Sequence, residues 1–526
     1  MIIRISILSD LSCHWCCCFH SRTRLDFMNR SLFIALILLS FAPSLKAETI
    51  DLRRAELLAL ERNLDLQAQV FETRASAAAV DREYGIYDPV AAAEMAKGVI
   101  RERINLTFLS QTPKNVVDYH RFDFFLSQII PTGAELRAGF INLREDSNST
   151  TRLFNPAYQS QLQFTLIQPL LRDFGRTLTE RGILFAITDR EISVQDLREE
   201  AFVLLTRVRD AYFDVLRFRD NLDYRETSVE LARRVMEENQ ARVNVGVLAP
   251  VEILEAEVGL KLRERELLDT SREYQDAIDN LAVLLNATGT IQVAEEPLGQ
   301  PEIAVSEERG LASALEKRPD VLRRMKEIER VELERKIARN QTLPALDLSA
   351  SYSHRGLGGD YNDDLDDIAS DEFRNWEIMA RISYPIGNRE ARNEYLRTRL
   401  RLKGNQARLE QLKEEVFREI RAAIRRLDVS SKMIEVASRG RDLAEEQLRT
   451  LLKRKGVGLA TTRDVLEGEE DLAEARTEHT AALADYNKAV TDYLRVTGQL
   501  LEHAGVRFTA AIEADGNGSP LGMDIQ

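Results

Sequence analysis

The sequence has almost no cysteine, and the few it has lie where a folded core would not use them. The 526 residues contain four, all upstream of Met28: Cys13, Cys16, Cys17 and Cys18. From Met28 the stretch "MNRSLFIALILLSFAPSLKAETI" has the charged start, apolar core and small-residue exit of a secretory signal. We therefore expect translation to start at Met28 and the leader to span residues 1–47. The cluster "CHWCCC" could be a metal site, but a place ahead of a signal favours discarded sequence.

Proline and aromatic residues are also scarce, with 13 prolines and 7% aromatics beside 30% charged residues. This mix favours long helices over several compact cores. After Ala47 no apolar run approaches the ~18 residues of a membrane-spanning helix, so a membrane crossing would have to use strands. The whole chain has a net charge of −14 and the leader carries three net positive charges, so the remainder carries −17, which disfavours nucleic acid as a partner.

Histidines that could serve catalysis or metal binding are few and scattered. After the signal they stand at His120, His354, His479 and His503, with neither the spacing of metal ligands nor a neighbouring nucleophile. We therefore expect a protein that is not an enzyme, with no cofactor and no metal.

What the sequence does contain is one unit written twice. "VNVGVLAPVEILEAE" is followed, 212 positions later, by "KGVGLATTRDVLEGE". Further pairs of anchors keep the same order in both copies: Asp65 with Asp320, Pro89 with Pro344, Pro169 with Pro385, and Gly246 with Gly458. The pattern predicts a first repeat over 48–289, a linker over 290–310, a second repeat over 311–500 and a flexible tail over 501–526.

Each repeat shows the same series of periods. A segment of helical period (53–84 and 309–341) ends near a proline, and strands of strict alternation follow (158–166, then 346–353 and 376–385). About 67 proline-free residues come next (176–243 and 388–455), enough for roughly 100 Å of helix with coiled-coil spacing. A second helix returns after each Val-Gly. Each repeat is therefore predicted to combine strands with a long helical hairpin.

The first repeat holds about 39 extra residues between its prolines. Phe122, Phe124 and Leu126 alternate before a Pro131-Thr132-Gly133 turn, and alternation resumes after it, which predicts an added hairpin at 121–143. The spacing does not decide whether this hairpin joins the other strands.

The strands place Leu, Phe and Tyr on one side and Gln, Ser and Thr on the other. This pattern is typical of an outer-membrane barrel, and also of a soluble sheet with one face on a core; the long charged helices favour the barrel. Four to six strands cannot close a barrel alone, so several chains would have to contribute.

Several motifs resemble those of the TolC-like outer-membrane efflux proteins, over about Leu52 to Leu500. They are "EKRPDVLRR", "LPALDLSASYS", "IQPLLRDFG", "AYFDVL" and the two Val-Gly tips. The resemblance implies a mainly helical fold with a β-barrel part, as a homotrimer with a 12-stranded barrel in the Gram-negative outer membrane and a 12-helix periplasmic tunnel. It also implies export of small molecules or proteins, by drug efflux or type I secretion, with a periplasmic adaptor (membrane fusion protein) and an inner-membrane pump.

The resemblance further assigns roles near the tips. Asp464 and Glu467 fall at the acidic pore constriction, although acids at a helix start also act as caps. Glu252 and Lys455 fall at gate links, and Arg463 could replace the basic residue that the family has where this chain has Ala460. The residues expected to meet the adaptor are Val245, Gly246, Val247, Leu248, Val457, Gly458 and Leu459.

Two alternatives concern other features. "GDYNDDLDDIASDE" (359–372) resembles a calcium loop, but Leu365 and Asp371 stand where the loop needs Gly and Glu, which favours a solvated acidic loop. A periplasmic coiled-coil adaptor or structural protein without a pore would also have long hairpins, but that class lacks barrel strands.

Overall fold

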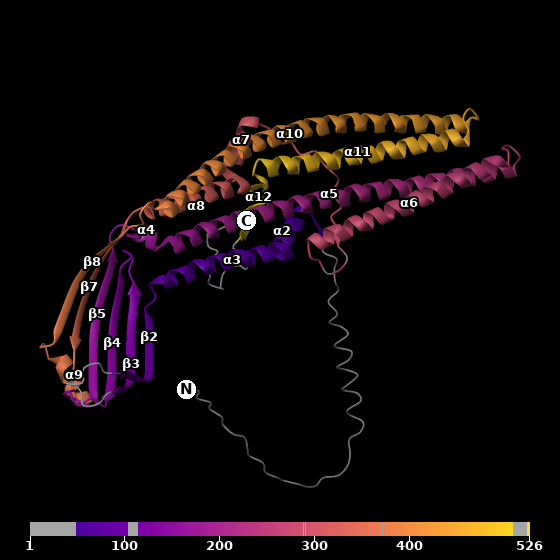
Figure 1. Ribbon diagram of the computed structural model, residues 1–526. Coiled ribbons are helices and arrows are strands. Elements are labelled where there is room, and N and C mark those ends of the chain that lie inside the picture. The colour runs from indigo at the N-terminus through magenta and orange to yellow at the C-terminus, as the bar shows by residue number, and fades with distance from the viewer. Residues whose placement is uncertain are drawn as a thin grey trace, which may run out of the picture. The chain divides into compact units, whose positions relative to one another are not determined.

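The computed structural model describes residues 49–103, 114–287, 289, 291–370, 372–508 and 523–525 (Figure 1). The chain divides into the units Met1–Thr49 and Ile50–Gln526, and the second is the one described below. It is mainly helical, with one six-stranded sheet, in agreement with the coarse prediction. None of the described helices has an apolar stretch long enough to cross a bilayer.

Each predicted first helix is interrupted at an equivalent residue. The first repeat has α2 (Leu52–Arg62) and α3 (Leu64–Tyr84), and the second has α7 (Glu307–Lys317) and α8 (Pro319–Asn340). Asn63 and Arg318 lie between them in extended conformation. The Asn63 side chain accepts the Leu66 N–H at 3.1 Å as a helix cap, and Pro319 restricts the residue before it to extended backbone. Each segment of helical period therefore forms two helices instead of one.

The same two residues hold the ends of the returning helices. Asn63 Nδ2 donates to the carbonyl of Leu284 at 3.2 Å, and Arg318 Nη1 donates to the carbonyl of Val496 at 3.3 Å. Leu284 and Val496 are 212 positions apart, as the tips are. The internal repeat thus extends to individual hydrogen bonds.

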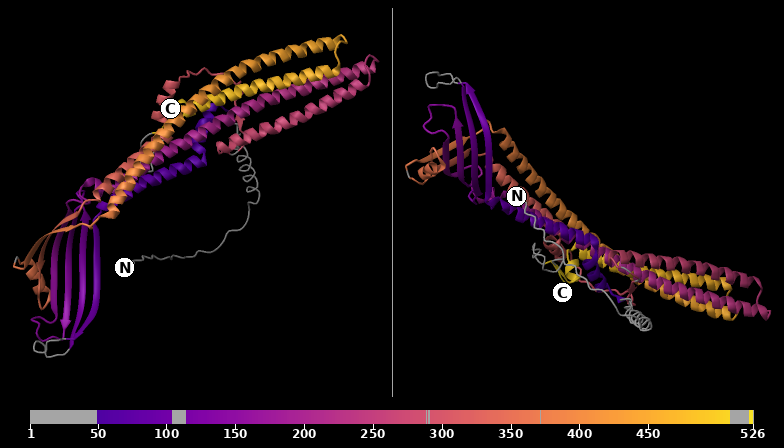
Figure 2. Two further views of the ribbon diagram at one scale, coloured as in Figure 1. Left: turned by 45° about the horizontal axis from the view of Figure 1, so that its top comes forward. Right: turned by 90° about the horizontal axis from the view of Figure 1, so that it is seen from below.

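The long hairpins have nearly the predicted lengths. After the short α4 (Arg176–Thr179), α5 (Arg181–Asn244) has 64 residues and α6 (Val251–Leu284) returns; α10 (Arg389–Gly456) has 68 and α11 (Thr462–Val496) returns. Of the residues on α5 with coiled-coil spacing, Leu197, Ala201, Leu204, Val208 and Val215 are buried, and Ala211, Phe218 and Leu222 are half-buried. Contacts order the helices nearest the sheet as α3, α5, α8 and α10, and α11 packs on α5 nearer the tips (Figures 1 and 2).

The large sheet is antiparallel, in the order β2-β3-β4-β5-β7-β8, and β5 and β7 are neighbours although the segment from α4 to α8 separates them in the chain. Its strands are β2 (Val90–Arg103), β3 (Lys114–Ile129), β4 (Glu135–Ser147), β5 (Ala157–Pro169), β7 (Ala345–Arg355) and β8 (Arg374–Ser383). The added hairpin is confirmed as β3–β4, and it joins the sheet. A 12-stranded trimeric barrel would need four strands per chain, so the number implied by the resemblance does not fit this sheet.

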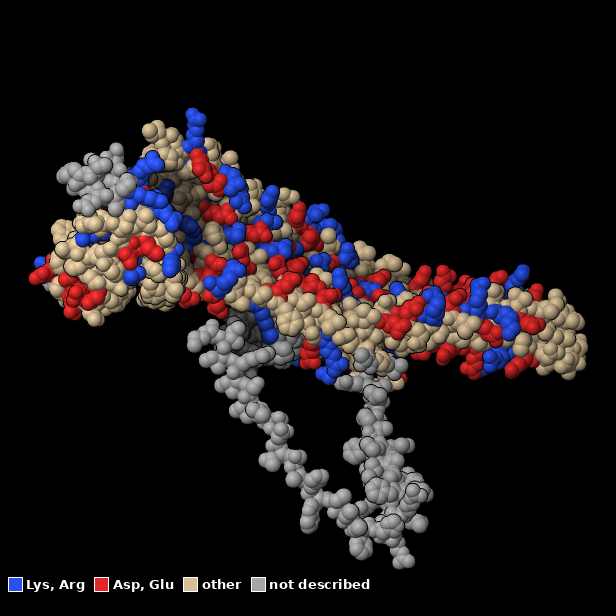
Figure 3. All heavy atoms as spheres, turned by 60° about the horizontal axis from the view of Figure 1, so that its bottom comes forward, with Lys and Arg blue, Asp and Glu red and all other residues tan. Residues whose placement is uncertain are grey.

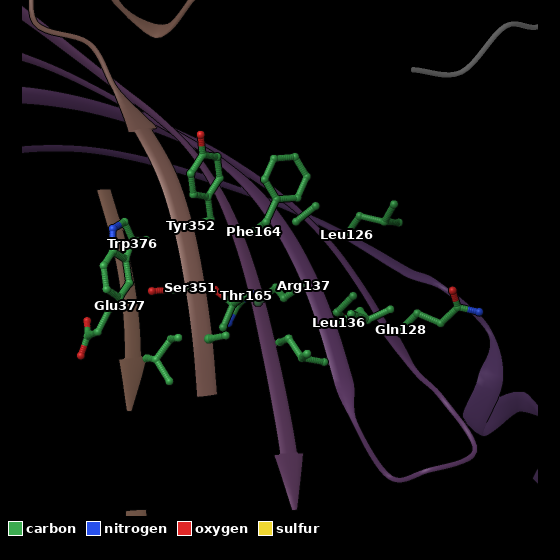
Figure 4. Close-up of a pocket in the computed structure, with 15 residues that line it drawn as sticks. Leu126, Gln128, Leu136, Arg137, Phe164, Thr165, Ser351, Tyr352, Trp376 and Glu377 are labelled. Atoms are coloured by element: carbon green, nitrogen blue, oxygen red, sulfur yellow. The ribbon is translucent and has the colours of Figure 1, made fainter. Parts of the chain in front are cut away.

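The register separates two faces of the sheet. One row across it reads Leu126, Ala138, Phe164, Tyr352 and Trp376, and the neighbouring row on the other face reads Ser127, Arg137, Thr165, Ser351 and Glu377. Figure 4 shows Leu126, Phe164 and Tyr352 in one row above the strands, where the apolar face lines a shallow cavity of about 550 Å³. The alternation predicted from the sequence is confirmed.

The acidic segment is helical rather than an irregular loop. It forms α9 (Tyr361–Ala369), which begins after a cap by Asp360. Asp364 is buried and accepts the Ser160 N–H of β5 at 2.9 Å and the Ser160 hydroxyl. The prediction of a fully solvated loop was wrong for this residue, and Asp371 lies outside the described residues. The smaller elements are η1 (Gly85–Tyr87), α12 (Leu500–His503), and the strand pairs β1 (Thr49–Ile50) with β6 (Gln292–Val293) and β9 (Val506–Phe508) with β10 (Met523–Ile525).

Candidate functional site at the hairpin tips

The first hairpin turns through a glycine in the left-handed region. Gly246 has φ 78°, and its N–H donates to the carbonyl of Val243 at 2.9 Å. The N–H of Val247 donates to the carbonyl of Arg242, also at 2.9 Å. These two bonds satisfy carbonyls at the end of α5 in the Schellman arrangement. A Cβ on Gly246 would meet no atom within 4 Å, so the backbone angle alone favours glycine here.

The second hairpin repeats this turn bond for bond. Gly458 has φ 80°, its N–H donates to the carbonyl of Lys455 at 3.1 Å, and the N–H of Leu459 donates to that of Arg454 at 2.8 Å. Both tips therefore need a residue that adopts a positive φ at the same place, which accounts for the repeated glycine.

The tips present apolar side chains to solvent. Val245, Val247, Val457 and Leu459 are 73%, 74%, 72% and 68% exposed, and Leu248 is half-buried. Figure 3 shows that the right-hand end of the hairpins lacks charged side chains, whereas charges of both signs cover the helices behind it. An exposed apolar patch on a charged protein is typical of a surface that binds another protein.

The two predicted constriction acids lie in the first two turns of α11. Asp464 completes a capping box: its N–H donates to Thr461 Oγ1 at 3.1 Å, and its carboxylate accepts the Thr461 N–H at 2.7 Å. That backbone hydrogen bond holds the pKa of Asp464 below its usual value. Glu467 is exposed three residues later, on the same side of the helix. Asp464 thus acts as a helix cap. Its role at the constriction stays a prediction.

Of the predicted gate residues Glu252, Lys455 and Arg463, Lys455 lies near enough to Glu252 for the glutamate charge to act on it. Lys455 is 6% exposed, and its Nζ has no hydrogen-bond partner among the described residues. Burial lowers the pKa of Lys455, while the charges of Glu238 and Glu252 act in the opposite direction. Glu252 is half-buried in the first turn of α6, and Arg463 is exposed.

A buried asparagine, which the sequence did not indicate, connects the two hairpins close to their tips. Asn239 of α5 is fully buried, and its Nδ2 donates to Thr462 Oγ1 of α11 at 2.8 Å and to the carbonyl of Glu252 at 3.1 Å. This amide of α5 therefore bonds to both α6 and α11.

A buried ion pair makes the second connection, further from the tips. Arg263 of α6 and Glu469 of α11 are each 5% exposed and bonded to each other through Nε. Arg263 also donates to the carbonyl of Leu466 at 2.6 Å and to that of Gly259 at 3.2 Å. The guanidinium is thus fixed between the hairpins on several sides.

In the sequence, a glycine inside a helix could have indicated the contact between the two hairpins. A Cβ on Gly259 of α6 would lie 2.7 Å from Leu466 of α11, across the two hairpins, whereas one on Gly468 would lie 2.5 Å from Leu451 of α10, within the second hairpin. A glycine in a helical pattern costs stability, so it often marks a close approach. Among the described residues, no group of three or more His, Cys, Asp or Glu side chains is placed to hold a metal ion.

Residues 139–287 and 310–499 match the family model described as outer membrane efflux protein. Three solved structures with the same fold are the outer membrane channel CmeC of Campylobacter jejuni (15% identity, 85% of this chain and 86% of that chain, TM-score 0.59), VceC of Vibrio cholerae (17%, 85% and 96%, 0.59) and the open state of the MtrE channel of Neisseria gonorrhoeae (17%, 85% and 89%, 0.58). No match was found among curated protein sequences.

Proposed function

Because the chain belongs to the outer membrane efflux protein family, we propose that three copies form an outer-membrane channel-tunnel that exports small molecules or proteins. A periplasmic adaptor would bind its tips and connect it to an inner-membrane pump. The observation that supports this assembly best is that the sheet and the helical layer both end in unpartnered edges, on the same two sides of the chain.

The sheet ends at β2 and β8, which have no described strand beyond them. Trp376, Ile378 and Ile382 of β8 are 73%, 67% and 69% exposed. A sheet edge facing lipid would leave backbone groups without hydrogen bonds, and six strands are fewer than the about eight that close a barrel. Neighbouring copies would have to supply the missing partners.

The helical layer ends at α3 and α10, each with an exposed apolar stripe. On α3 the stripe contains Leu64 and Phe71, 62% and 63% exposed, with alanines at 68, 75 and 78. On α10 it contains Leu396 and Leu400, 47% and 60% exposed, followed by Ala407. Steps of three and four residues are the spacing of a coiled-coil seam.

Charge and register favour pairing of α3 with α10 of the next copy. α3 has four acidic and two basic residues, and residues 389–408 of α10 have seven basic and two acidic ones. If β2 pairs with β8 of a neighbouring copy, the start of β2 at Val90 lies beside the end of β8 at Ser383. A residue of α3 then lies beside the residue of α10 that is the same number of positions from its own strand. Asp81 then lies beside Arg392, and Asp65 beside Arg408; all four side chains are exposed.

At the tips, we propose that Asp464 and Glu467 line the constriction and that Glu252, Lys455 and Arg463 take part in closing it. The exposed apolar tip residues would contact the adaptor, because burying them is favourable by about 25 cal/mol per Å² of apolar surface removed from water. A periplasmic adaptor or structural protein without a pore is not favoured, because it would not need a sheet with one largely apolar, exposed face.

Cysteine cross-linking tests the assembly. A chain with Asp81→Cys and Arg392→Cys should form covalent dimers and trimers on oxidation, since each seam joins two copies. The control, Asp81→Cys with Arg408→Cys, has the same native cysteines but separates the two positions along the seam, so it should stay uncross-linked. Equal cross-linking in both chains, or none in the first, would contradict the proposed seam.

A further inference from the structure

We infer that three copies build an 18-stranded barrel about as wide as the helical tunnel below it, and that this barrel admits solutes as large as a small folded polypeptide. This inference rests on the proposed trimer and goes beyond it, because the resemblance implied only 12 strands. It concerns the size of solute that the barrel itself would pass, which is separate from the constriction proposed at the tips.

The first support is that the sheet spans the full width of the helical layer. α3, one edge of that layer, leads into β2 through η1, and β8 leads into α10, the other edge, through residues 384–388. The edge strands therefore continue from the edge helices. All six strands belong to one continuous antiparallel sheet, with β3 and β4 fully paired to their neighbours.

The second support is a match of perimeters. Strands about 4.8 Å apart and tilted by about 40° each occupy roughly 6 Å of a barrel's perimeter, so six strands span roughly 37 Å. Four helices about 10 Å apart span roughly 40 Å. Four strands at the same spacing and tilt would span about 25 Å, so they would match four helices only with a larger tilt.

The same spacings give the width of the closed assembly. Eighteen strands form a barrel with a backbone radius of about 18 Å, and twelve form one of about 12 Å. Twelve helices form a ring of about 19 Å radius. Side chains extend about 5 Å inward, half the separation of packed sheets, which leaves a free radius of about 13 Å for 18 strands and about 7 Å for 12.

The polar face carries short side chains on β5 and β7. On β5 it carries Gln161, Gln163 and Thr165, and on β7 it carries Ser351 and Ser353. These side chains are small or medium-sized and uncharged. On β3, β4 and β8 the same face carries the larger side chains Phe125, Arg137 and Glu377, so the pore would be widest along β5 and β7.

The helix at the far end of the sheet also leaves the polar face free. α9 contacts β5 through Asp364 on Ser160 and through the ring of Tyr361 on Tyr158, with centroids 6.1 Å apart. Ser160 and Tyr158 alternate in step with Leu162 and Phe164, so they belong to the apolar face. α9 therefore packs on the outer side of the sheet.

Size-graded labelling tests the width. Ser351→Cys and its neighbour Tyr352→Cys place one thiol on each face of β7, and both chains carry the same native cysteines. Each purified protein, with its oligomeric state measured by native mass, would be treated with a small maleimide and with three maleimide-polymers of increasing radius. The first polymer is narrower than the bore of a 12-stranded barrel, the second is wider than that bore but narrower than the bore of 18 strands, and the third is wider than both.

The second polymer gives the decisive result. We expect Ser351→Cys to react with the first and second polymers within about tenfold of the small-maleimide rate and not with the third. Tyr352→Cys should react with none of the polymers, because its side chain would face lipid or detergent.

The outcomes separate this inference from the proposed function. Trimers whose Ser351→Cys thiol accepts only the small maleimide or the first polymer would overturn the wide barrel and leave the channel intact. Reaction of Tyr352→Cys in place of Ser351→Cys would overturn the assignment of the pore face, and the wide barrel with it. A protein that is not trimeric would overturn the assembly on which both depend.

Discussion

Removal of one partner of the Arg263–Glu469 pair should open the contact between the hairpins. In Glu469→Ala, the guanidinium of Arg263 would keep its bonds to the carbonyls of Leu466 and Gly259 but lose the carboxylate that neutralises it. Both side chains are 5% exposed, so water could not replace that carboxylate without movement of the helices.

The expected loss is about 3–5 kcal/mol, because a buried charge left without its partner costs far more than the pair contributes. At about 1.4 kcal/mol per factor of ten, local opening should become more frequent by roughly 150-fold or more. Hydrogen exchange of the backbone amides at 462–475 reports this opening directly.

Two further variants control for this interpretation. Asp276→Ala removes one partner of an exposed pair on the same helix, Arg272–Asp276 at 2.7 Å, and should cost about 0.5 kcal/mol or less. The double change Arg263→Met with Glu469→Leu removes both charges and should recover most of the loss. If Glu469→Ala protected these amides as well as Asp276→Ala does, the pair would not hold the hairpins together.

Three other predictions concern separate sites. Gly246→Val should cost about 1–2 kcal/mol because Gly246 has φ 78°, and should weaken adaptor binding in a pull-down while Gly246→Asn has a smaller effect. Asp464→Asn with Glu467→Gln should lower cation selectivity in a planar bilayer at low salt; unchanged selectivity would leave these acids as helix caps only. Burial raises the pKa of Asp210 to about 6 from 3.8, so protonation stabilises the fold: the wild type should gain stability as pH falls from 7 to 5, and Asp210→Asn should lose this gain, as measured by denaturant midpoints.

The parts of the fold that the sequence predicted are those with strong local signals. The hairpins follow from proline-free periodic segments, and the tips follow from glycines that the φ values of Gly246 and Gly458 require. The break at Arg318 could be predicted from Pro319, which follows it. The break at Asn63 depends on a capping hydrogen bond from the Leu66 N–H, and an asparagine does not always accept such a bond.

The parts that were missed depend on partners distant in sequence. The strand β2, "VAAAEMAKGVIRER", is rich in alanine and has low strand propensity, so its pairing with β3 decides its conformation. Arg263 and Glu469 are separated by 206 residues and look like ordinary exposed charges on two helices. The tip residues were identified correctly as turns, while the pore and gate roles remain predictions.

Native mass spectrometry of the intact protein, extracted from outer membranes in detergent, tests the central claim most directly. The unpaired edges of the sheet and the exposed stripes of α3 and α10 predict a single species of three chains. A folded, monodisperse species of one chain would contradict the shared barrel, because it would show that six strands and four helices in a layer need no neighbour.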